Sequence, residues 1–534
     1  MSTDPEKSNT QAVVASINDS NDHKDSITDS LPSYKFFQSA KGELSNYDST
    51  DIVLRTKINL INDALDEIGF TWYHFKLYCL NGMGYAVDSE LTFIQSSVAQ
   101  YVRYQFNQTY PADSHAIYAG LLVGAIFWGF GADLIGRKIA FNTSLLLSAI
   151  FAILTGAMGN FATYCLFVAF SAAASGGNLV LDTTVFLEFL PSKYQWLVTL
   201  MASWWGVGQT IAVLTTWLFF SHDEYICSGG LGDCPSGENM GWRYVWFVNG
   251  GFVLIVAILR LTIIKLEETP KFLVCNQRDE EAVLCLQKIA NKYNRSCSLT
   301  VEQLQECGQI TGNENFLSNP TFMSTIKSIK KHIKVLFSNK LMALSTSLLF
   351  SKWTLLGISY PLYSNFLPIY LATRGANTSA DSTAGVYRDS VISNASSIGG
   401  GLIGGAILYL VPVLGRKGVM IIGGLISMAL FFGYTAVRTR SQNVALSSSV
   451  YVAINIYYSC LYAYTPEVMP SSARATGNAI SVACMRGMAC IVPAIAYFSD
   501  TSSSIPVWIC GACVGLISIC SIFLPFEPSK QRVA

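Results

Sequence analysis

Two aspartates stand inside apolar stretches that are long enough to cross a lipid bilayer. Asp88 lies near the middle of the first stretch, and Asp182 lies toward one end of the fourth. Surroundings of low polarity disfavour the charged form of an acid and so favour proton binding. Either side chain could therefore take up a proton on one side of a membrane and release it on the other. We predict a proton-coupling role for both, with a purely structural pairing of each acid as the alternative.

Other polar side chains share a helix face with these acids. The first stretch carries a series spaced by three or four residues, Asn81, Gly84, Asp88, Thr92 and Gln95. The fourth carries a second such series, Ser171, Ser175, Asn178 and Asp182. This spacing places the members on one side of a helix, where lipid could not satisfy their hydrogen bonds. Both faces should therefore line a watery cavity or pack against protein.

The second half of the chain supplies a cation, Arg486, inside an apolar stretch. It lies about ten residues from the nearer end, too deep to reach the surface easily, so it needs a counter-charge or an anionic ligand. Lys352 in the seventh stretch could instead extend toward the surface. Aromatic and amide side chains in the fifth and tenth stretches would suit a hydroxylated or aromatic ligand. The predicted substrate cavity comprises Asn81, Thr92, Gln95, Asn178, Trp205, Gln209, Asn455, Tyr458 and Arg486.

A charged motif joins the second and third apolar stretches, Gly129-Phe-Gly-Ala-Asp133-Leu-Ile-Gly136-Arg137-Lys138. Part of it returns 279 residues later as Gly415-Arg416-Lys417, and the same offset carries Glu188 onto Glu467. One offset that matches two separate motifs indicates parallel repeats, as in transporters whose site lies between two halves.

These charges can cluster against neighbouring helix ends. We predict a conformational latch that holds the two halves together in one state and releases them in another. A loop that only fixes membrane topology is the alternative. The predicted latch comprises Gly129, Asp133, Gly136, Arg137, Lys138, Glu188, Arg416, Lys417, Glu467 and Arg474.

The composition indicates lipid surroundings. Only 13% of the 534 residues are charged and 51% are hydrophobic, whereas soluble proteins have about a quarter charged residues. The apolar residues form twelve blocks of about 20, the length that a helix needs to cross the hydrocarbon core. The net charge of zero argues against a nucleic-acid partner. The predicted fold class is an all-α membrane protein with twelve transmembrane helices in two six-helix bundles.

This prediction divides the chain into five parts. They are a disordered tail with a short amphipathic segment (1–72), the first bundle (73–266), a central loop (267–340), the second bundle (341–526) and a short tail (527–534). The amphipathic segment, Ile58–Phe70, could lie on the membrane surface or dock on protein. Lysines and arginines of the central loop predict that this loop and both termini are cytosolic. Three features of the opposite loops agree, a disulfide between Cys227 and Cys234 and the glycosylation sequons at Asn107 and Asn377.

The segment from Gly129 to Lys138 resembles the signature loop of the major facilitator superfamily. Glu268-Thr-Pro-Lys-Phe-Leu273 and Tyr464-Thr-Pro-Glu467 are similar to motifs of its sugar porters. Gly176-Gly-Asn178-Leu-Val-Leu-Asp182 and Trp204-Trp205-Gly-Val-Gly208-Gln209 resemble transporters related to synaptic vesicle glycoproteins. Because related sugar porters carry a proton-coupling acid in their first span, the resemblance supports that role for Asp88.

We therefore expect a secondary transporter that moves a small organic solute, sugar-like or an organic ion, by alternating access and with proton coupling. The expected partners are the solute, protons and lipid, without cofactor or metal, and the expected state is a monomer in the plasma membrane or an endomembrane such as the endoplasmic reticulum or vacuole. A solute sensor without net transport is the main alternative, and a multi-spanning enzyme is another. The lack of clustered catalytic residues argues against the enzyme.

Overall fold

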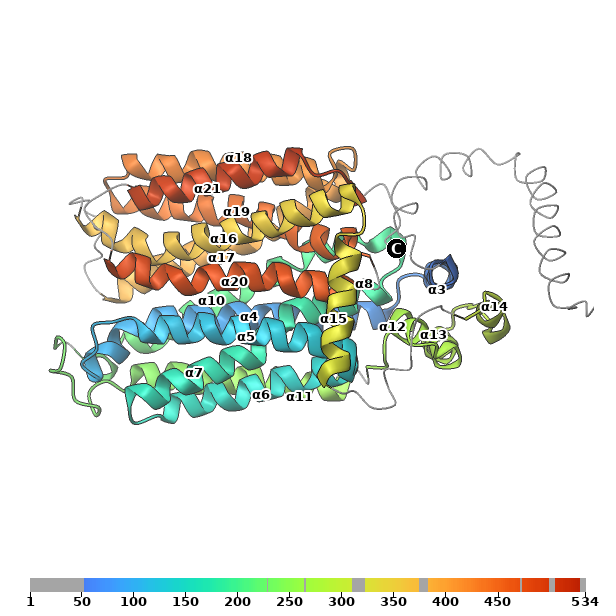
Figure 1. Cartoon of the computed structure of the whole chain (residues 1–534). Helices are drawn as coiled ribbons and strands as arrows, with labels where there is room; N and C mark the ends of the chain where they lie inside the picture. The colour runs from blue at the N-terminus through green and yellow to red at the C-terminus, as the bar shows by residue number, and fades with distance from the viewer. Residues whose placement is uncertain are drawn as a thin grey trace, which may run out of the picture. The chain divides into compact units, whose positions relative to one another are not determined.

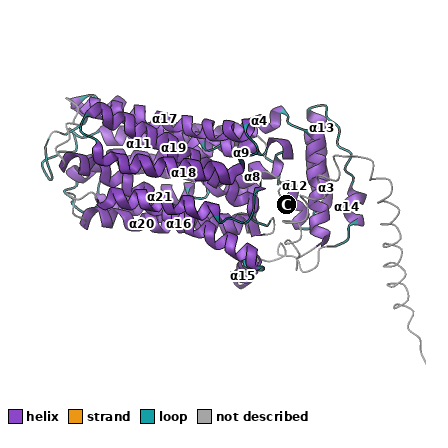
Figure 2. Cartoon of the chain, turned by 90° about the horizontal axis from the view of Figure 1, so that it is seen from above, coloured by secondary structure: helices purple, strands orange, loops and turns teal. Residues whose placement is uncertain are grey.

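The computed structural model describes residues 52–227, 229–263, 266–309, 322–373, 383–470, 473–498 and 505–528, without the side chains of 52, 132–135, 322–328 and 365–373. All its elements are helices (Figures 1 and 2). The first half contains α4 (Trp72–Gln105), α5 (Ala112–Ile135), α6 (Arg137–Ala157), α7 (Phe161–Ser175), α8 (Asn178–Phe189), α9 (Trp196–Leu200), α10 (Ser203–Phe220) and α11 (Gly241–Ile263). The second half contains α16 (Lys340–Thr373), α17 (Thr383–Leu410), α18 (Gly415–Gly433), α19 (Arg440–Val468), α20 (Arg474–Phe498) and α21 (Ile505–Ile522).

Within the described ranges, eleven helical segments are long and apolar enough to cross a membrane. They are α5, α6, α7 with α8, α9 with α10, α11, and α16 to α21. Helix α4 runs beside them over 34 residues and is long enough to cross as well. Its polar series, together with Lys76, Glu90 and Arg103, lowers its hydropathy. With α4 the fold has twelve spans, as the sequence predicts.

The two halves pack by the same scheme. In the first half α4 packs on α10, α5 on α7, and α6 on α11. In the second half the equivalent helices pair in the same way, α16 on α20, α17 on α19, and α18 on α21. The halves meet along two seams, where α10 packs on α17 and α5 packs on α20. The repeat seen in the sequence is therefore a repeat of packing as well.

Two predicted spans are interrupted. The fourth breaks into α7 and α8 at Gly176 and Gly177, and the fifth breaks into α9 and α10 at Met201 and Ala202. The first break has a local cause, because two consecutive glycines weaken a helix by about 1 kcal/mol each relative to alanine. It places the polar residues of α8 on a segment of their own.

A cluster of short helices covers one end of the first half. It comprises α3 (Ile52–Ile68), α12 (Pro270–Cys275), α13 (Asp279–Lys292) and α14 (Val301–Glu306). We call this end of the bundle the inner end. A further helix, α15 (Phe322–Leu336), crosses the direction of the spans near the inner end (Figure 1).

Helix α3 resolves an alternative that the sequence left open. Its apolar residues Ile58, Ile61, Leu65 and Ile68 are at most 3% exposed, and it packs on α12 and α13. Lys57 of α3 also bonds Asp279 of α13 at 2.5 Å. The amphipathic segment is therefore a docked helix, which begins at Ile52, before the predicted Ile58.

Candidate functional site

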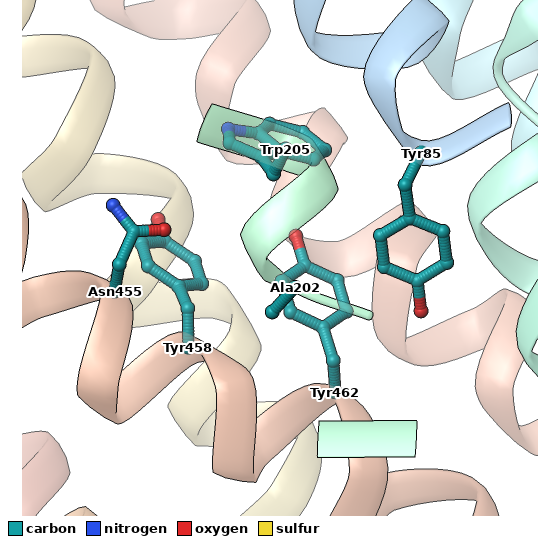
Figure 3. A pocket seen from close by; sticks show the side chains of 6 residues that line it. All are labelled: Tyr85, Ala202, Trp205, Asn455, Tyr458 and Tyr462. Atoms are coloured by element: carbon teal, nitrogen blue, oxygen red, sulfur yellow. The ribbon is translucent and has the colours of Figure 1, made fainter. Parts of the chain in front are cut away.

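A cavity lies between the two halves of the protein. Its lining residues are Tyr85 of α4, Ala202 and Trp205 at the start of α10, and Asn455, Tyr458 and Tyr462 of α19 (Figure 3). Its free volume is about 10 Å³, room for about one water molecule. Four aromatic rings and one amide face one another across the boundary between halves. Such a lining can stack on a flat group and hydrogen bond to it.

An ion pair joins the halves beside this cavity. Arg486 of α20 donates to Asp88 of α4 at 2.5 Å, and their side chains are 4% and 0% exposed. The guanidinium also lies 5.8 Å from the ring of Trp205, a cavity residue. The second carboxylate oxygen of Asp88 and Nε of Arg486 have no hydrogen-bond partner within the described part of the chain. Each member of the pair therefore has one polar atom that could form a further hydrogen bond.

Contacts between the halves flank the cavity. Gln209 donates to Tyr360 at 2.9 Å and accepts from Ser397 at 3.3 Å, which joins α10 to α16 and α17. Nearer the outer end, Tyr387 donates to the carbonyl of Ser97 at 3.0 Å. Toward the inner end, Gly129 of α5 lies against Ala479 of α20. The cavity is therefore closed by protein on both sides.

Of the nine residues predicted for a substrate cavity, Trp205, Asn455 and Tyr458 line the one observed, and Arg486 and Gln209 lie next to it. The predicted cavity did not include Tyr85, Ala202 or Tyr462. Tyr462 shares a helix face with Asn455 and Tyr458 in the sequence, but aromatic residues at that spacing are more often packed than ligand-binding.

Four residues predicted for the cavity do not line it. Gln95 donates to Asp113 at 2.7 Å and accepts from Tyr164 at 2.7 Å, and Asn178 accepts from Ser144 at 2.7 Å. Both side chains thus form hydrogen bonds within the first half, although the amide nitrogen of Asn178 has no partner in the described part of the chain. Thr92 bonds the carbonyl of Asp88, and Asn81 is fully buried in α4.

Asp182 belongs to a second ion pair that lies within the first half. Arg260 of α11 donates to both of its carboxylate oxygens, at 2.9 and 3.1 Å, and both side chains are 0% exposed. The same guanidinium bonds the carbonyls of Phe141 and Leu80. The sequence prediction missed Arg260, which lies near the end of α11 and so does not share the depth that singled out Arg486.

Two more ionisable side chains are buried without an opposite charge among their described contacts. Lys352 is 0% exposed, lies 3.4 Å from the sulfur of Met420 and faces the rings of Tyr457 and Tyr464. It points into the second half and does not reach the surface. Glu90 of α4 is also 0% exposed, and neither of its carboxylate oxygens has a hydrogen-bond partner in the described part of the chain.

The predicted latch residues form a cluster at the inner end of each half. In the first half Arg137 pairs with Glu188 and donates to Thr269. The backbone amides of Arg137 and Lys138 donate to Glu268 at 3.2 and 2.8 Å. The carboxylate of Glu268 thus caps the N-terminus of α6, as the helix dipole and the unpaired amides favour, while Glu188 pairs with the Arg137 side chain.

The second half repeats this arrangement. Arg416 pairs with Glu467, and the amides of Arg416 and Lys417 donate to Glu527 at 2.9 and 3.1 Å. Arg416 also reaches the first half, where it donates to the carbonyl of Gln195 at 3.3 Å. The ion pairs of the predicted latch therefore lie within each half, and the link between halves is a contact to backbone. Glu527 was missed because it lies outside the 279-residue offset.

Glycine is required at the head of each cluster. Gly136 and Gly415 have φ angles of 93° and 63°, a backbone conformation that residues with a side chain rarely adopt. A Cβ atom would lie 2.9 Å from Glu268 at the first position and 2.6 Å from Glu527 at the second. The side chain of Asp133 lies outside the described residues. Arg474 is fully buried and donates to the carbonyl of Pro466 at 2.8 Å.

Loops at the outer end carry the remaining predicted features. Cys227 and Cys234 are joined by a disulfide, with Cα atoms 5.7 Å apart, which is an ordinary separation. Asn107 is exposed in the loop after α4, as a glycan acceptor must be. Asn377 lies outside the described residues.

One lysine at the inner end is buried among charges. Lys271 of α12 is 3% exposed. Burial, together with the nearby Arg474, lowers the pKa of its ammonium group to about 7, while Glu188 opposes the shift. A group of this kind makes the packing of α12 depend on pH.

Comparison with known proteins identifies the family of this chain. A model of the Major Facilitator Superfamily matches residues 77–493. A siderochrome iron transporter of Ceriporiopsis subvermispora is 35% identical over 494 residues, 91% of this chain and 93% of the relative. A synaptic vesicle 2-related protein of Rattus norvegicus is 24% identical over 89% of this chain and 82% of its own.

Among solved structures, a proton:xylose symporter, XylE, superposes with a TM-score of 0.63 over 86% of this chain and 98% of its own, at 16% identity. At 16% identity this similarity is evidence for the fold alone.

The Asp182–Arg260 pair yields a test of stability. Arg260→Met should leave Asp182 buried without its cation and lower the free energy of unfolding by about 3–5 kcal/mol. The double variant Asp182→Asn/Arg260→Met should regain much of that loss, because no charge remains buried. Melting midpoints of the purified protein in detergent measure both. Arg278→Met, which breaks an exposed pair with Glu281, is the control and should change little. An unchanged midpoint for Arg260→Met would contradict a structural role for the pair.

Lys271 yields a test of pH dependence. Its pKa is lower in the folded protein, about 7, than in the unfolded chain, about 10.4. Between these two pH values the unfolded state binds more protons than the folded state. Burial of the Lys271 ammonium group therefore lowers the free energy of unfolding by its full amount below about pH 7, and by less as the pH rises. Between pH 6.5 and 8.5 the native protein should gain about 2 kcal/mol relative to Lys271→Met. Melting midpoints of both proteins at the two pH values measure this, and parallel curves would contradict it.

Proposed function

The chain belongs to the major facilitator superfamily, and we propose that it carries a small organic anion with a flat ring together with a proton. It is a multi-pass membrane protein and a transporter of small solutes, as its family and relatives are. The ion pair between Asp88 and Arg486 is the observation that supports the finer proposal. It lies beside the cavity, it joins the two halves, and it is almost completely buried.

Proton binding and anion binding are coupled through this pair. A proton on Asp88 removes the counter-charge of Arg486, which itself stays charged because its pKa is far above neutrality. The guanidinium is then a buried cation that needs a new anionic partner. The carboxylate of a solute supplies it, because the planar fork of arginine matches a carboxylate in two hydrogen bonds. Asp88 can accept a proton without breaking other contacts, since its second oxygen has no partner within the described residues.

Charge balance favours an anion over other cargo. The empty site, with Asp88 ionised and Arg486 protonated, has no net charge. The loaded site, with Asp88 neutral and an anion on Arg486, also has none. A cationic solute beside Asp88 and Arg486 would leave one net positive charge, which is costly in a low-dielectric interior. A neutral sugar with a proton would leave the same excess.

The lining of the cavity fits the rest of such a solute. The rings of Trp205, Tyr458 and Tyr462 can stack on a flat group, and Asn455 offers a donor and an acceptor. In this conformation the free volume of the cavity is about 10 Å³, room for about one water molecule. The halves must therefore move apart before a solute can enter, so the volume in this conformation does not set the size of the cargo.

Alternating access follows from the arrangement of contacts. Each half is held by its own inner-end cluster, whereas few polar contacts join the halves, among them Asp88–Arg486 and Arg416–Gln195. Exchange of Asp88 for a solute on Arg486 removes one of these joins. We place the inner end, the central loop and both termini in the cytosol, on the lysines of that loop. Asp182 we assign to the fold, because its pair lies within one half.

Transport by purified protein in liposomes tests this proposal. A panel of small aromatic carboxylates is offered with and without a pH gradient, acidic outside, and uptake is measured by mass spectrometry. One proton per anion allows about tenfold accumulation per pH unit. Asp88→Asn should abolish this accumulation while still exchanging anion across the membrane, because Arg486 stays available. Arg486→Gln should lose both activities.

Two controls make the result specific. Asp223→Asn, at an exposed acid outside the site, should transport normally. A membrane potential imposed with potassium and valinomycin should not change accumulation, because the anion and proton cancel in charge. Accumulation that follows the potential would mean that more than one proton accompanies each anion, and accumulation that survives Asp88→Asn would contradict the assigned proton site. Binding of an anion without any transport would support the solute sensor.

A further inference from the structure

Helix α15 lies across the spans at the margin of the bundle. In Figure 1 it crosses the direction of the spans near the inner end, and in Figure 2 it lies at the edge of the bundle beside α20 and α16. Both neighbours contact it. A helix in this orientation runs parallel to the membrane plane at about the depth of the lipid headgroups.

One face of α15 is held by α20. His332 bonds the hydroxyl of Thr476 at 3.1 Å. Leu336 is 0% exposed and lies next to Gly477, where an added Cβ would be 3.1 Å away from it. Burial and the neighbouring Lys331 lower the pKa of His332, so its ring is neutral at pH 7. The histidine therefore contributes an anchor and no charge.

The side of α15 away from this anchor is basic. Lys330, Lys331 and Lys334 are exposed, as is Lys340 at the start of α16. No Asp or Glu occurs between Asn315 and Ala380. The positive charge of this surface is thus not neutralised by acids of its own segment.

An exposed apolar stripe borders the lysines. Ile333 and Phe337 are 36% and 43% exposed, and Leu341 and Leu344 of α16 continue the stripe at 37% and 46%. At helical spacing Ile333 and Phe337 stand between the anchored face and the lysines. An apolar stripe beside a lysine-rich face is typical of helices that lie in a membrane interface.

From this arrangement we propose that α15 binds the anionic phospholipid headgroups of the inner leaflet. The lysines meet lipid phosphates and carboxylates, and the apolar stripe enters the boundary between headgroups and acyl chains. An acidic protein could meet the lysines, but the stripe is continuous with the lipid-facing start of α16, which selects lipid as the occupant.

This contact acts on the helix that carries Arg486. The anchor at Thr476 precedes Arg486 by ten residues of α20, about 15 Å along the helix. A headgroup bound to α15 therefore restrains the inner end of α20, one of the two helices of the ion pair that joins the halves.

Native mass spectrometry of the full-length protein tests the proposal. Protein from detergent is titrated with phosphatidylserine or phosphatidylcholine, and bound lipids are counted. Lys330→Gln/Lys334→Gln should weaken phosphatidylserine binding roughly 30-fold, since each lysine near an anionic surface contributes about fivefold. Lys288→Gln/Lys292→Gln removes the same charge from α13, where both lysines are exposed, and should change the affinity less than about twofold.

Several outcomes would overturn the proposal. Equal binding of the two lipids by the native protein would exclude recognition of charge. Equal losses in both double variants would mean that net charge, and not α15, attracts the lipid. Soluble glycerophosphoserine should fail to compete, because it cannot engage the apolar stripe. If it competes as well as the lipid, the lysines bind a free phosphate and α15 is no membrane contact. Ile333→Ser, which spares every lysine, should also weaken lipid binding.

Discussion

The high cost of an unpaired charge in a low-dielectric interior organises this protein. A buried ion that loses its partner destabilises a fold by several kcal/mol, so each intramembrane charge must be matched or functional. Asp182 with Arg260, Arg137 with Glu188, and Arg416 with Glu467 meet this demand inside one half each. Asp88 with Arg486 meets it across the two halves. Three of these ion pairs thus link helices within one half, and the fourth links the two halves.

The repeat explains how rigid halves and a mobile join coexist. Both halves place a glycine with positive φ before an arginine, and both close the following helix N-terminus with a glutamate that comes after the last span of that half. These clusters fix helix ends within a half. The seams between halves are two helix pairs, α10 with α17 and α5 with α20. Such an architecture can rock at the seams while its internal contacts persist.

The cavity and the ion pair would recognise different properties of a solute. Rings from α10 and α19 supply shape and stacking, which many flat molecules satisfy. In the proposed mechanism, selectivity for charge and the requirement for a proton come from the exchange of partners at Arg486. Neither feature lies on one helix, since α4, α10, α19 and α20 all contribute. Packing of the whole bundle therefore sets the site.

The sequence by itself determined the spans, their repeat, the charged motif and the intramembrane charges, because length, composition and spacing are local properties. It did not determine which polar residues face the cavity. In a bundle surrounded by lipid both sides of a helix are apolar, so the pattern does not mark the side that meets protein. Gln95 and Asn178 accordingly proved to form their hydrogen bonds within the first half. The partners of Asp182 and Asp88 lie 78 and 398 residues away, and the docking of α3 depends on α12 and α13. Only tertiary packing decides such contacts, because burial energy acts between surfaces that the chain brings together after its helices have formed.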